Sequence, residues 1–249
     1  MSSERALIPR YGRARRDEAL VVLEGFHPLK HALRFGARVL EVICEDRPAL
    51  EGLCEQLAPD LLGQIMELAR EVPEGLLGKI APLRPSTGVM ALAERPPVDP
   101  LAVLADARPA PVVLLDDPRD LGNMGACIRV AAAADAGGVL VLGGHDPWHP
   151  DVLRGAAGLH FALPVARLPE GLPRELDRPL VALDPDGEPL RPGVLPARAL
   201  LAFGSERRGL SEQLLARARR RVAIPMRAGV SSLNLATSVA VVLFAGGMS

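Results

Sequence analysis

The sequence has few of the features that place a chain in a specialised class of protein. Aromatic residues make up only 3% of its 249 residues. No apolar run approaches the roughly 20 residues that a membrane-spanning helix needs, and residues 1–20 carry several arginines but lack the apolar core of a signal peptide. The apolar content of 49% is too high for a disordered chain. Together these observations predict a soluble cytoplasmic protein with no membrane partner.

Patterns for disulfides and metal sites are also missing. The cysteines are odd in number and show no CxxC spacing, so we predict buried small side chains at Cys44, Cys54 and Cys127. His27 and His31 lie four residues apart on a predicted helix, but no third ligand follows nearby. Residues 145–151 contain two histidines and two aspartates, yet two prolines prevent the helix that would gather them. We therefore expect no bound metal.

The charge of the chain is nearly balanced, at −1, which argues against non-specific binding of polyanions. Its distribution is uneven, because arginines crowd residues 5–16 and 207–227 while the only lysines are Lys30 and Lys79. Arginine suits bidentate contacts with phosphate and stacking on bases. A genome that replaces lysine by arginine throughout would produce the same excess, so the clusters alone leave phosphate binding and simple bias equally open.

The distribution of proline and of apolar runs predicts four segments. They are a mobile basic N-terminal arm over 1–19, a smaller mixed domain over 20–93, a proline-rich linker over 94–111 and a larger domain over 112–249. In the larger domain, short apolar runs without alternation are typical of parallel strands buried on both faces. These runs are 112–116, 139–142, 180–183, 200–203 and 222–224. Helical stretches over 125–136, 210–221 and 234–245 complete a predicted parallel α/β sheet.

Three of the predicted strands end in loops that are rich in glycine and polar side chains. The loops cover residues 116–125, 204–210 and 224–234. The carboxyl ends of parallel strands meet at one edge of a sheet, which is where α/β proteins bind ligands. Helix capping explains any one of these loops, but three at one edge predict a binding site. Neither GxGxxG nor GK[ST] occurs in them, so a dinucleotide or phosphate-loop site is not indicated.

The loops resemble the three motifs of the SpoU-type RNA 2'-O-ribose methyltransferases, members of the SPOUT superfamily. Residues 123–129 are similar to the first motif, 203–210 to the second and 224–236 to the third. Residues 20–93 resemble, more weakly, the ribosomal-protein-like domain with which many of these enzymes bind RNA. The resemblance implies an α/β fold with a parallel-sheet SPOUT methyltransferase domain that ends in a C-terminal deep trefoil knot. A smaller α/β substrate-binding domain precedes it.

The resemblance also implies a reaction and the residues that perform it. The family transfers a methyl group from S-adenosylmethionine to a ribose 2'-hydroxyl, here of ribosomal or transfer RNA. It works as a homodimer with its sites near the subunit interface, to which the alanine-rich stretch 127–136 is a candidate contributor. The implied cofactor-binding residues are Leu183, Gly204, Ile224, Met226 and Leu233. The implied catalytic residues are Asn123, Arg129, Glu206, Ser232 and Asn234.

Arg129 is the residue that the resemblance places nearest to the chemistry. A ribose hydroxyl is a poor nucleophile, so it must be held in line with the bond that breaks and must lose its proton. Arg129 matches the arginine proposed in the family to position or deprotonate that hydroxyl. Because arginine has a pKa above about 12, positioning is the favoured role. Asn123 is then expected to orient Arg129 or the ribose, and Glu206 to hold Asn123 or Arg129.

Two alternatives to an active methyltransferase stay open on the residues alone. One is an RNA-binding protein that binds S-adenosylmethionine without turnover, against which the joint presence of the five implied catalytic residues speaks. The other is a metal-dependent hydrolase on the same sheet, for which no ligand set is evident. Ser231, where many relatives have an acid, and a longer first motif depart from the family pattern. Trp148 is a candidate for stacking on a base, with plain packing as the alternative.

Overall fold

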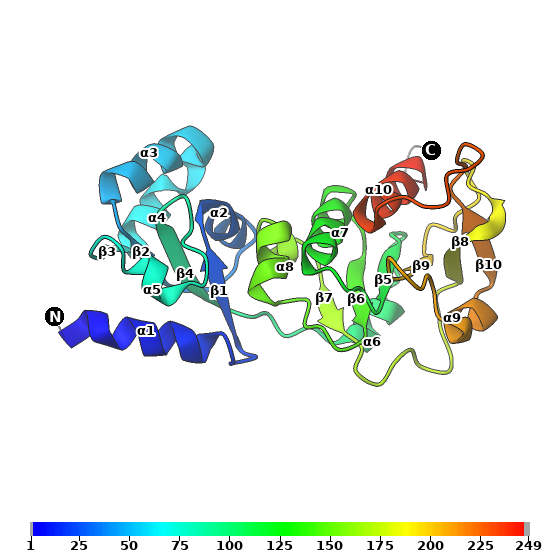
Figure 1. The fold of residues 1–249 in the computed structure, drawn as a ribbon, viewed down its shortest axis with the longest axis horizontal. Helices are drawn as coiled ribbons and strands as arrows, with labels where there is room; N and C mark the ends of the chain where they lie inside the picture. The colour runs from blue at the N-terminus through cyan, green and yellow to red at the C-terminus, as the bar shows by residue number, and fades with distance from the viewer. Residues whose placement is uncertain (1, 247–249) are drawn as a thin grey trace. The chain divides into compact units, whose positions relative to one another are not determined.

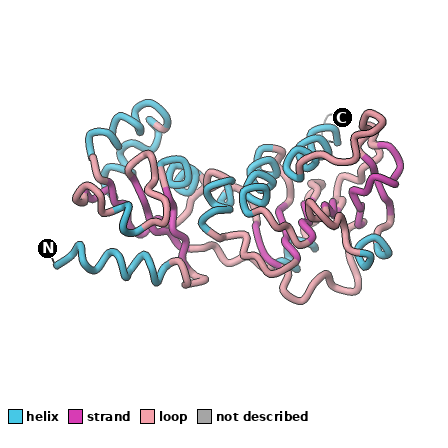
Figure 2. The backbone as a smooth tube through the Cα atoms, viewed as in Figure 1, coloured by secondary structure: helices cyan, strands magenta, loops and turns pink. Residues whose placement is uncertain are grey.

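The computed structural model describes residues 2–246, which form two compact units. One unit comprises Met1–Pro97 with Ala157–Ala162, and the other comprises Val98–Ala156 with Leu163–Ser249. Each unit contains one β-sheet (Figures 1 and 2). Met1 in the predicted arm and residues 247–249 in the predicted larger domain lie outside the described residues. Within residues 2–246, no helix is long and apolar enough to cross a membrane.

The N-terminal unit is built on a four-stranded sheet in the order β1-β4-β2-β3. Its strands are β1 (Leu20–Glu24), β2 (Val39–Cys44), β3 (Ala69–Glu71) and β4 (Val89–Glu94). Its helices are α1 (Ser2–Ala14), α2 (Phe26–Arg34), α3 (Arg47–Leu57), α4 (Leu62–Leu68) and α5 (Leu77–Ile80), with 3-10 turns at Pro59–Leu61 and Leu159–Phe161. β4 runs antiparallel to β1 and β2. The strand carboxyl ends of this sheet therefore do not meet at one edge.

The predicted mobile arm over 1–19 is wrong in one respect, because most of it is the helix α1. Leu7, Tyr11 and Ala14 are buried in the core of the N-terminal unit, and α1 packs against α5. An ion pair of 2.8 Å between Arg15 and Glu24 adds a second attachment. These apolar residues are spaced by four and three positions, which is the spacing of one helix face. The surrounding arginines hid that face in the sequence.

The C-terminal unit is built on six parallel strands in the order β10-β8-β9-β5-β6-β7. They are β5 (Val112–Asp116), β6 (Gly138–Leu142), β7 (Val165–Arg167), β8 (Leu180–Pro189), β9 (Leu200–Phe203) and β10 (Arg220–Ala223). The helices are α6 (Pro100–Ala105), α7 (Leu121–Ala133), α8 (Pro150–Gly155), α9 (Glu212–Arg217) and α10 (Leu235–Gly246). The predicted parallel α/β sheet is confirmed. Only β7, three residues long, was not predicted.

Helices cover both faces of the parallel sheet. Leu104 of α6 and Leu214 of α9 share a buried cluster with Leu114, Leu140 and Leu200 of the strands. The helices α7 and α10 lie side by side on the opposite face, together with α8 (Figure 1). Strands covered on both faces must be apolar throughout, which explains the uninterrupted apolar runs in the sequence.

The predicted linker over 94–111 also differs from the structure, because it contains the helix α6. Pro100 occupies the first turn of this helix, where a missing N–H costs nothing. Asp99 caps the helix by accepting a hydrogen bond of 2.9 Å from the N–H of Leu101. Val103 and Leu104 are buried in the core. The proline-rich composition thus marked the start of a helix as well as a connection.

The pairing of β8 with β10 contains an irregularity that shapes the carboxyl edge of the sheet. Arg221 and Val222 are consecutive on β10, yet they pair with Ala182 and Glu188 on β8. Residues 183–187 therefore bulge out of the ladder. A Cβ on Gly187 would lie 2.5 Å from backbone atoms of Arg221 and Val222, so only glycine allows this close approach. The bulge carries Leu183 and Asp184 to the edge at which the site lies.

Candidate active site

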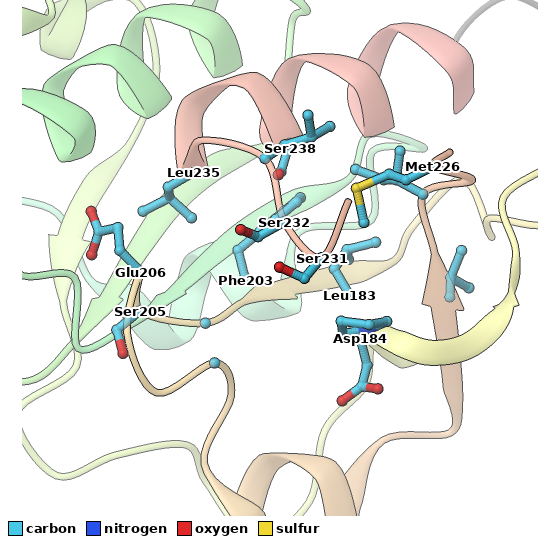
Figure 3. Close-up of a pocket in the computed structure, with 16 residues that line it drawn as sticks. Leu183, Asp184, Phe203, Ser205, Glu206, Met226, Ser231, Ser232, Leu235 and Ser238 are labelled. Carbon is cyan, nitrogen blue, oxygen red and sulfur yellow. The ribbon is translucent and has the colours of Figure 1, made fainter. Parts of the chain in front are cut away.

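A pocket opens at the carboxyl edge of the parallel sheet. Its space of about 700 Å³ is partly open to solvent, and its walls come from the ends of β8 and β9, the loop after β10 and the start of α10 (Figure 3). The apolar lining residues are Leu183, Pro185, Phe203, Val222, Ile224, Met226, Leu233 and Leu235. The remaining lining residues are Asp184, Gly204, Ser205, Glu206, Gly209, Ser231, Ser232 and Ser238. The structure thus brings together all five residues implied as cofactor-binding.

Gly204 is required by the backbone packing of the pocket wall. A Cβ at this position would lie 2.0 Å from the carbonyl carbon of Gly209 and 2.2 Å from the nitrogen of Leu210. The loop between them is closed by backbone hydrogen bonds of 3.1 and 3.0 Å that Ser205 and Gly209 exchange. Gly209 adopts a φ of 67°, which glycine tolerates without strain. This tight loop forms one wall and presents the exposed side chain of Glu206 at the rim.

A chain of side-chain hydrogen bonds joins the three motif loops. The Nδ2 of Asn234 donates to Oδ1 of Asn123 over 2.9 Å, and the Nδ2 of Asn123 donates to Oε1 of Glu206 over 2.9 Å. The Oδ1 of Asn234 also accepts from the N–H of Ala236, at the start of α10. Each amide is therefore held in a defined orientation by a donor and an acceptor. We name this set, Asn234–Asn123–Glu206, the amide chain.

The loop before α7 forms hydrogen bonds with two members of the amide chain. Asp120 caps α7, and its Oδ1 accepts from the N–H of Asn123 over 2.7 Å. The helix therefore begins at Leu121, four residues earlier than predicted. The N–H of Arg119 donates to the second carboxylate oxygen of Glu206 over 3.4 Å. Glu206 is thus held by Arg119 of the loop and by Asn123 in the first turn of α7.

Arg129 does not contact the amide chain of the same molecule. It lies six residues after Asn123 on α7, which places the two side chains on different sides of the helix. Its side chain is exposed and makes no hydrogen bond or ion pair with any residue in the range 2–246. Ser232 lines the pocket but does not take part in the amide chain. Of the five implied catalytic residues, the structure connects three.

Several side chains outside the implied set are explained by packing. All three cysteines are buried, and burial, followed by the charge of Glu206, raises the pKa of the Cys127 thiol so that it stays protonated. Trp148 is buried and donates to the carbonyl of Val165 over 3.1 Å, so it packs rather than offering a surface for a base. Nδ1 of His31 lies 2.7 Å from the carbonyl oxygen of Ala157. Across the described chain, no group of three or more potential ligands could hold a metal ion.

Some residues of the site were not predicted. Asp184 and Pro185 line the pocket because of the bulge in β8, and Ser205 and Ser238 line it from the second loop and from α10. Asp184 does follow the apolar run of its strand, so its place at the carboxyl edge was a usable signal. The backbone contact of Arg119 with Glu206 had no such signal, because any residue type can supply an N–H.

The chain is similar to known proteins over most of its length. The model of the SpoU rRNA Methylase family matches residues 110–244. A 23S rRNA (adenosine(1067)-2'-O)-methyltransferase of Streptomyces laurentii is 29% identical over 236 residues, which cover 90% of this chain and 84% of that protein. The 23S rRNA (guanosine(2553)-2'-O)-methyltransferase RlmP of Bacillus subtilis is 27% identical, covering 90% of this chain and 86% of the relative.

Solved structures give the same result. A crystal structure of an RNA 2'-O ribose methyltransferase is 30% identical with a TM-score of 0.70, covering 95% of this chain and 94% of the other. The SpoU methyltransferase AviRb of Streptomyces viridochromogenes is 26% identical with a TM-score of 0.74, covering 97% and 93%. An AdoMet-bound rRNA methyltransferase of Sinorhizobium meliloti is 26% identical with a TM-score of 0.69, covering 98% and 92%.

Proposed function

The chain belongs to the SpoU rRNA methylase family, and on that premise we propose that it transfers a methyl group from S-adenosylmethionine to a ribose 2'-hydroxyl of RNA. The observation that carries the proposal is the amide chain at the rim of the pocket, because it joins the three loops that hold the family motifs. Relatives from Streptomyces laurentii and Bacillus subtilis are named for action on 23S rRNA. Their names favour ribosomal over transfer RNA as the substrate.

The pocket suits S-adenosylmethionine in its chemistry. Its walls combine apolar side chains with polar groups, as the walls of small-molecule sites do. Apolar side chains such as Leu183, Ile224 and Leu233 would enclose the adenine and the carbon atoms next to the sulfonium, with Met226 beside them. The backbone that Gly204 allows to approach closely would supply hydrogen-bonding groups. The bound cofactor supplies a methyl group on a positively charged sulfur.

Asn123 is well prepared to hold the acceptor ribose. Its amide nitrogen carries two N–H donors, of which Glu206 engages one. The second can donate to a ribose oxygen, while Asn234 fixes the amide through Oδ1. In this proposal Glu206 holds Asn123, Asn123 orients the ribose, and Ser232 closes the pocket around cofactor and acceptor.

The amide chain contains no arginine that could position the acceptor hydroxyl, and a homodimer would supply one. Arg129 is exposed on another side of α7, and the adjacent helix α10 exposes Val241 and Phe244 by 37% and 48%. Apolar side chains exposed on neighbouring helices are typical of a subunit contact. We infer that they pack against a second copy and that Arg129 positions an acceptor hydroxyl in the assembled dimer.

Two further parts of the proposal are the trefoil knot and the binding of RNA by the N-terminal unit. The chain passes from β10, at one edge of the sheet, to α10, which packs on α7 beyond β8 and β9. This crossing over the strand ends supports a knotted path. In the N-terminal unit, the exposed arginines Arg13 and Arg16 on and after α1 support contact with phosphates.

The proposal is tested with S-adenosylmethionine labelled in its methyl group and with ribosomal and transfer RNA from a strain that lacks the enzyme. We expect wild type to label one ribose, which nuclease mapping of the product identifies. Arg129→Ala should lower transfer by roughly 100-fold or more, because a misplaced hydroxyl forfeits the alignment of the reacting atoms. Its affinity for S-adenosylmethionine, measured by calorimetry, should not change.

The control is Arg174→Ala, which removes an exposed arginine from the segment between β7 and β8 and should transfer as wild type does. Cofactor binding by wild type without transfer to any RNA would support the alternative of a binding protein without turnover. Undiminished transfer by Arg129→Ala would remove that arginine from the mechanism.

A further inference from the structure

A second hollow lies beside the amide chain, within the C-terminal unit. It is an open space of about 880 Å³ between the start of α7 and the helix α8. We name it the arginine hollow; its lining residues are Arg119, Asp120, Leu121, Gly122, Asp151, Arg154 and Gly155. None of these residues belongs to the sets implied for cofactor or catalysis.

Glycines leave the floor of the arginine hollow without side chains. A Cβ on Gly125 would lie 2.4 Å from the carbonyl oxygen of Val152, and a Cβ on Gly155 would lie 2.9 Å from that of Gly122. The two helices therefore approach each other through their backbones. Gly122 itself is exposed. Gly122 and Gly155 line the hollow where the two helices meet, and neither has a side chain to keep a flat group from the backbone.

Two arginines stand on this floor, each oriented by a carboxylate. Nη2 of Arg119 lies 2.6 Å from Oδ2 of Asp117, and Nη2 of Arg154 lies 3.0 Å from Oδ1 of Asp151. Both side chains are well exposed, by 58% and 42%. An arginine held in one plane can pair with a phosphate through two N–H groups and can stack on a base. The negative charge of the nearby carboxylates weakens the binding of a polyanion by charge alone. Recognition of RNA in the hollow therefore requires contact with a base as well as with a phosphate.

The arginine hollow is mechanically connected to the amide chain. Asp120 caps α7 at Asn123, and the N–H of Arg119 donates to Glu206. The same loop contains Asp117, whose φ of 49° is unusual for a residue with a side chain. Such a conformation persists only where the surrounding structure enforces it. Asp117 packs closely against Gly143, where a Cβ would lie 2.6 Å from Oδ1 of Asp117. A group bound in the hollow would thus sit at a fixed place relative to Asn123.

We propose that the arginine hollow binds a nucleotide of the substrate RNA that neighbours the methylated one. Its base lies on the glycine floor against a guanidinium group, and its phosphate pairs with Arg119 and Arg154. This inference rests on the proposed function, since it assigns the acceptor ribose to Asn123. It makes the two arginines positioning residues for the RNA and not for the cofactor.

The test compares the full-length double variant Arg119→Ala/Arg154→Ala with wild type, using a ribosomal RNA transcript that wild type methylates. We expect the KM for RNA to rise about tenfold or more, as loss of one stacked base and its phosphate contacts predicts. The slope of log(kcat/KM) against log salt concentration should become shallower by about 0.7, because the nucleotide has one phosphate and each phosphate of a single strand that is no longer neutralised contributes about 0.7. Affinity for S-adenosylmethionine should not change.

Two further variants sharpen the result. Arg119→Lys/Arg154→Lys keeps the charges but loses the planar groups, so it should restore the salt slope while KM stays raised. The matched control Arg174→Ala/Arg191→Ala removes two exposed arginines elsewhere in the unit and should transfer as wild type does. Light scattering should give one molar mass for all variants. A lower mass for the alanine pair would show that the hollow is a subunit contact and would overturn the proposal.

The outcomes separate this inference from the proposed function. Unchanged KM and salt slope in the alanine pair, with active wild type, would overturn the arginine hollow alone. If wild type transfers no methyl group, the proposed function fails. In that case the affinity for a labelled single-stranded RNA oligonucleotide still tests whether the arginine hollow binds RNA. Equal binding by wild type and by the alanine pair would reject the hollow as an RNA site.

Discussion

The two edges of the six-stranded sheet use polar side chains in opposite ways. At the amino edge, Arg178 is 1% exposed and donates to the carbonyls of Leu104, Asp106 and Ala110 over 3.0, 2.8 and 2.7 Å. Arg198 donates to the same carbonyl of Asp106. At the carboxyl edge, the members of the amide chain bond to one another and stay accessible.

This difference shows which edge can serve chemistry. A buried arginine that satisfies backbone carbonyls has nothing left to offer a ligand, and its removal leaves those carbonyls unpaired. Exposed side chains that bond to one another add little to stability, yet they hold donors at defined places. The amino edge therefore keeps the sheet folded, and the carboxyl edge is free to bind cofactor and RNA. Three predictions test that division, and a fourth concerns the N-terminal unit.

The largest effect is expected at the amino edge. Arg178→Met should lower the free energy of unfolding by about 3–5 kcal/mol, because three carbonyl groups each lose a donor and an unsatisfied buried group costs roughly 1–3 kcal/mol. Arg198→Met, which removes a half-buried side chain from the same carbonyl, should cost about 1 kcal/mol. Urea unfolding measures both. In both variants the affinity of the folded protein for the cofactor should equal that of wild type. A loss of cofactor binding by the folded variants would contradict the assignment of binding to the carboxyl edge alone.

Asn123→Ala should produce the next largest effect, at the carboxyl edge. Removal of the central amide should lower kcat by about 100-fold, because the acceptor loses its alignment. The free energy of unfolding should change by less than about 1 kcal/mol, and cofactor affinity should not change. Gln64→Ala, an exposed amide of the N-terminal unit, is the control. Stopped-flow and steady-state transfer assays supply the rates; a large loss of stability with normal kcat would contradict the assignment.

Gly204→Ala tests the pocket wall. The added methyl group meets backbone atoms of Gly209 and Leu210 at 2.0 and 2.2 Å, so the loop must move. Overpacking of this kind costs roughly 1–3 kcal/mol, and we expect affinity for S-adenosylmethionine to fall about tenfold. Gly144→Ala, with no atom within 4 Å of its added Cβ, is the matched control. Calorimetric titration compares them, and equal affinities would mean that the wall does not contact the cofactor.

The smallest effect is expected at His31, in the N-terminal unit. Burial lowers the pKa of His31 below its usual value of 6.5, so the unfolded chain takes up a proton on this ring at a higher pH than the folded protein does. Stability should therefore fall as the pH decreases through about 6.5. In His31→Gln the free energy of unfolding should depend less on pH between about 5 and 7.5. Parallel pH profiles for variant and wild type would exclude this contribution.

Much of the C-terminal unit was predictable because the residue types of its strands reflect how those strands are buried. Strands such as β5 and β9, buried on both faces, read as uninterrupted apolar runs. The helix α1 was missed because three buried residues lay among arginines, and α6 because its prolines suggested a connection. In both cases local composition outweighed a short periodic signal.

The sequence by itself determined the parallel sheet and the motif loops, and through its resemblance to known motifs it pointed to five residues, implied as cofactor-binding, that line the pocket. Tertiary structure decided how those residues are connected. That Glu206 holds Asn123, that Asp184 reaches the pocket through a bulge, and that Arg129 stands apart all depend on where strands end in space. Hydrogen bonds between residues more than 80 positions apart leave no local pattern. They arise only because parallel strands bring their carboxyl ends to one edge.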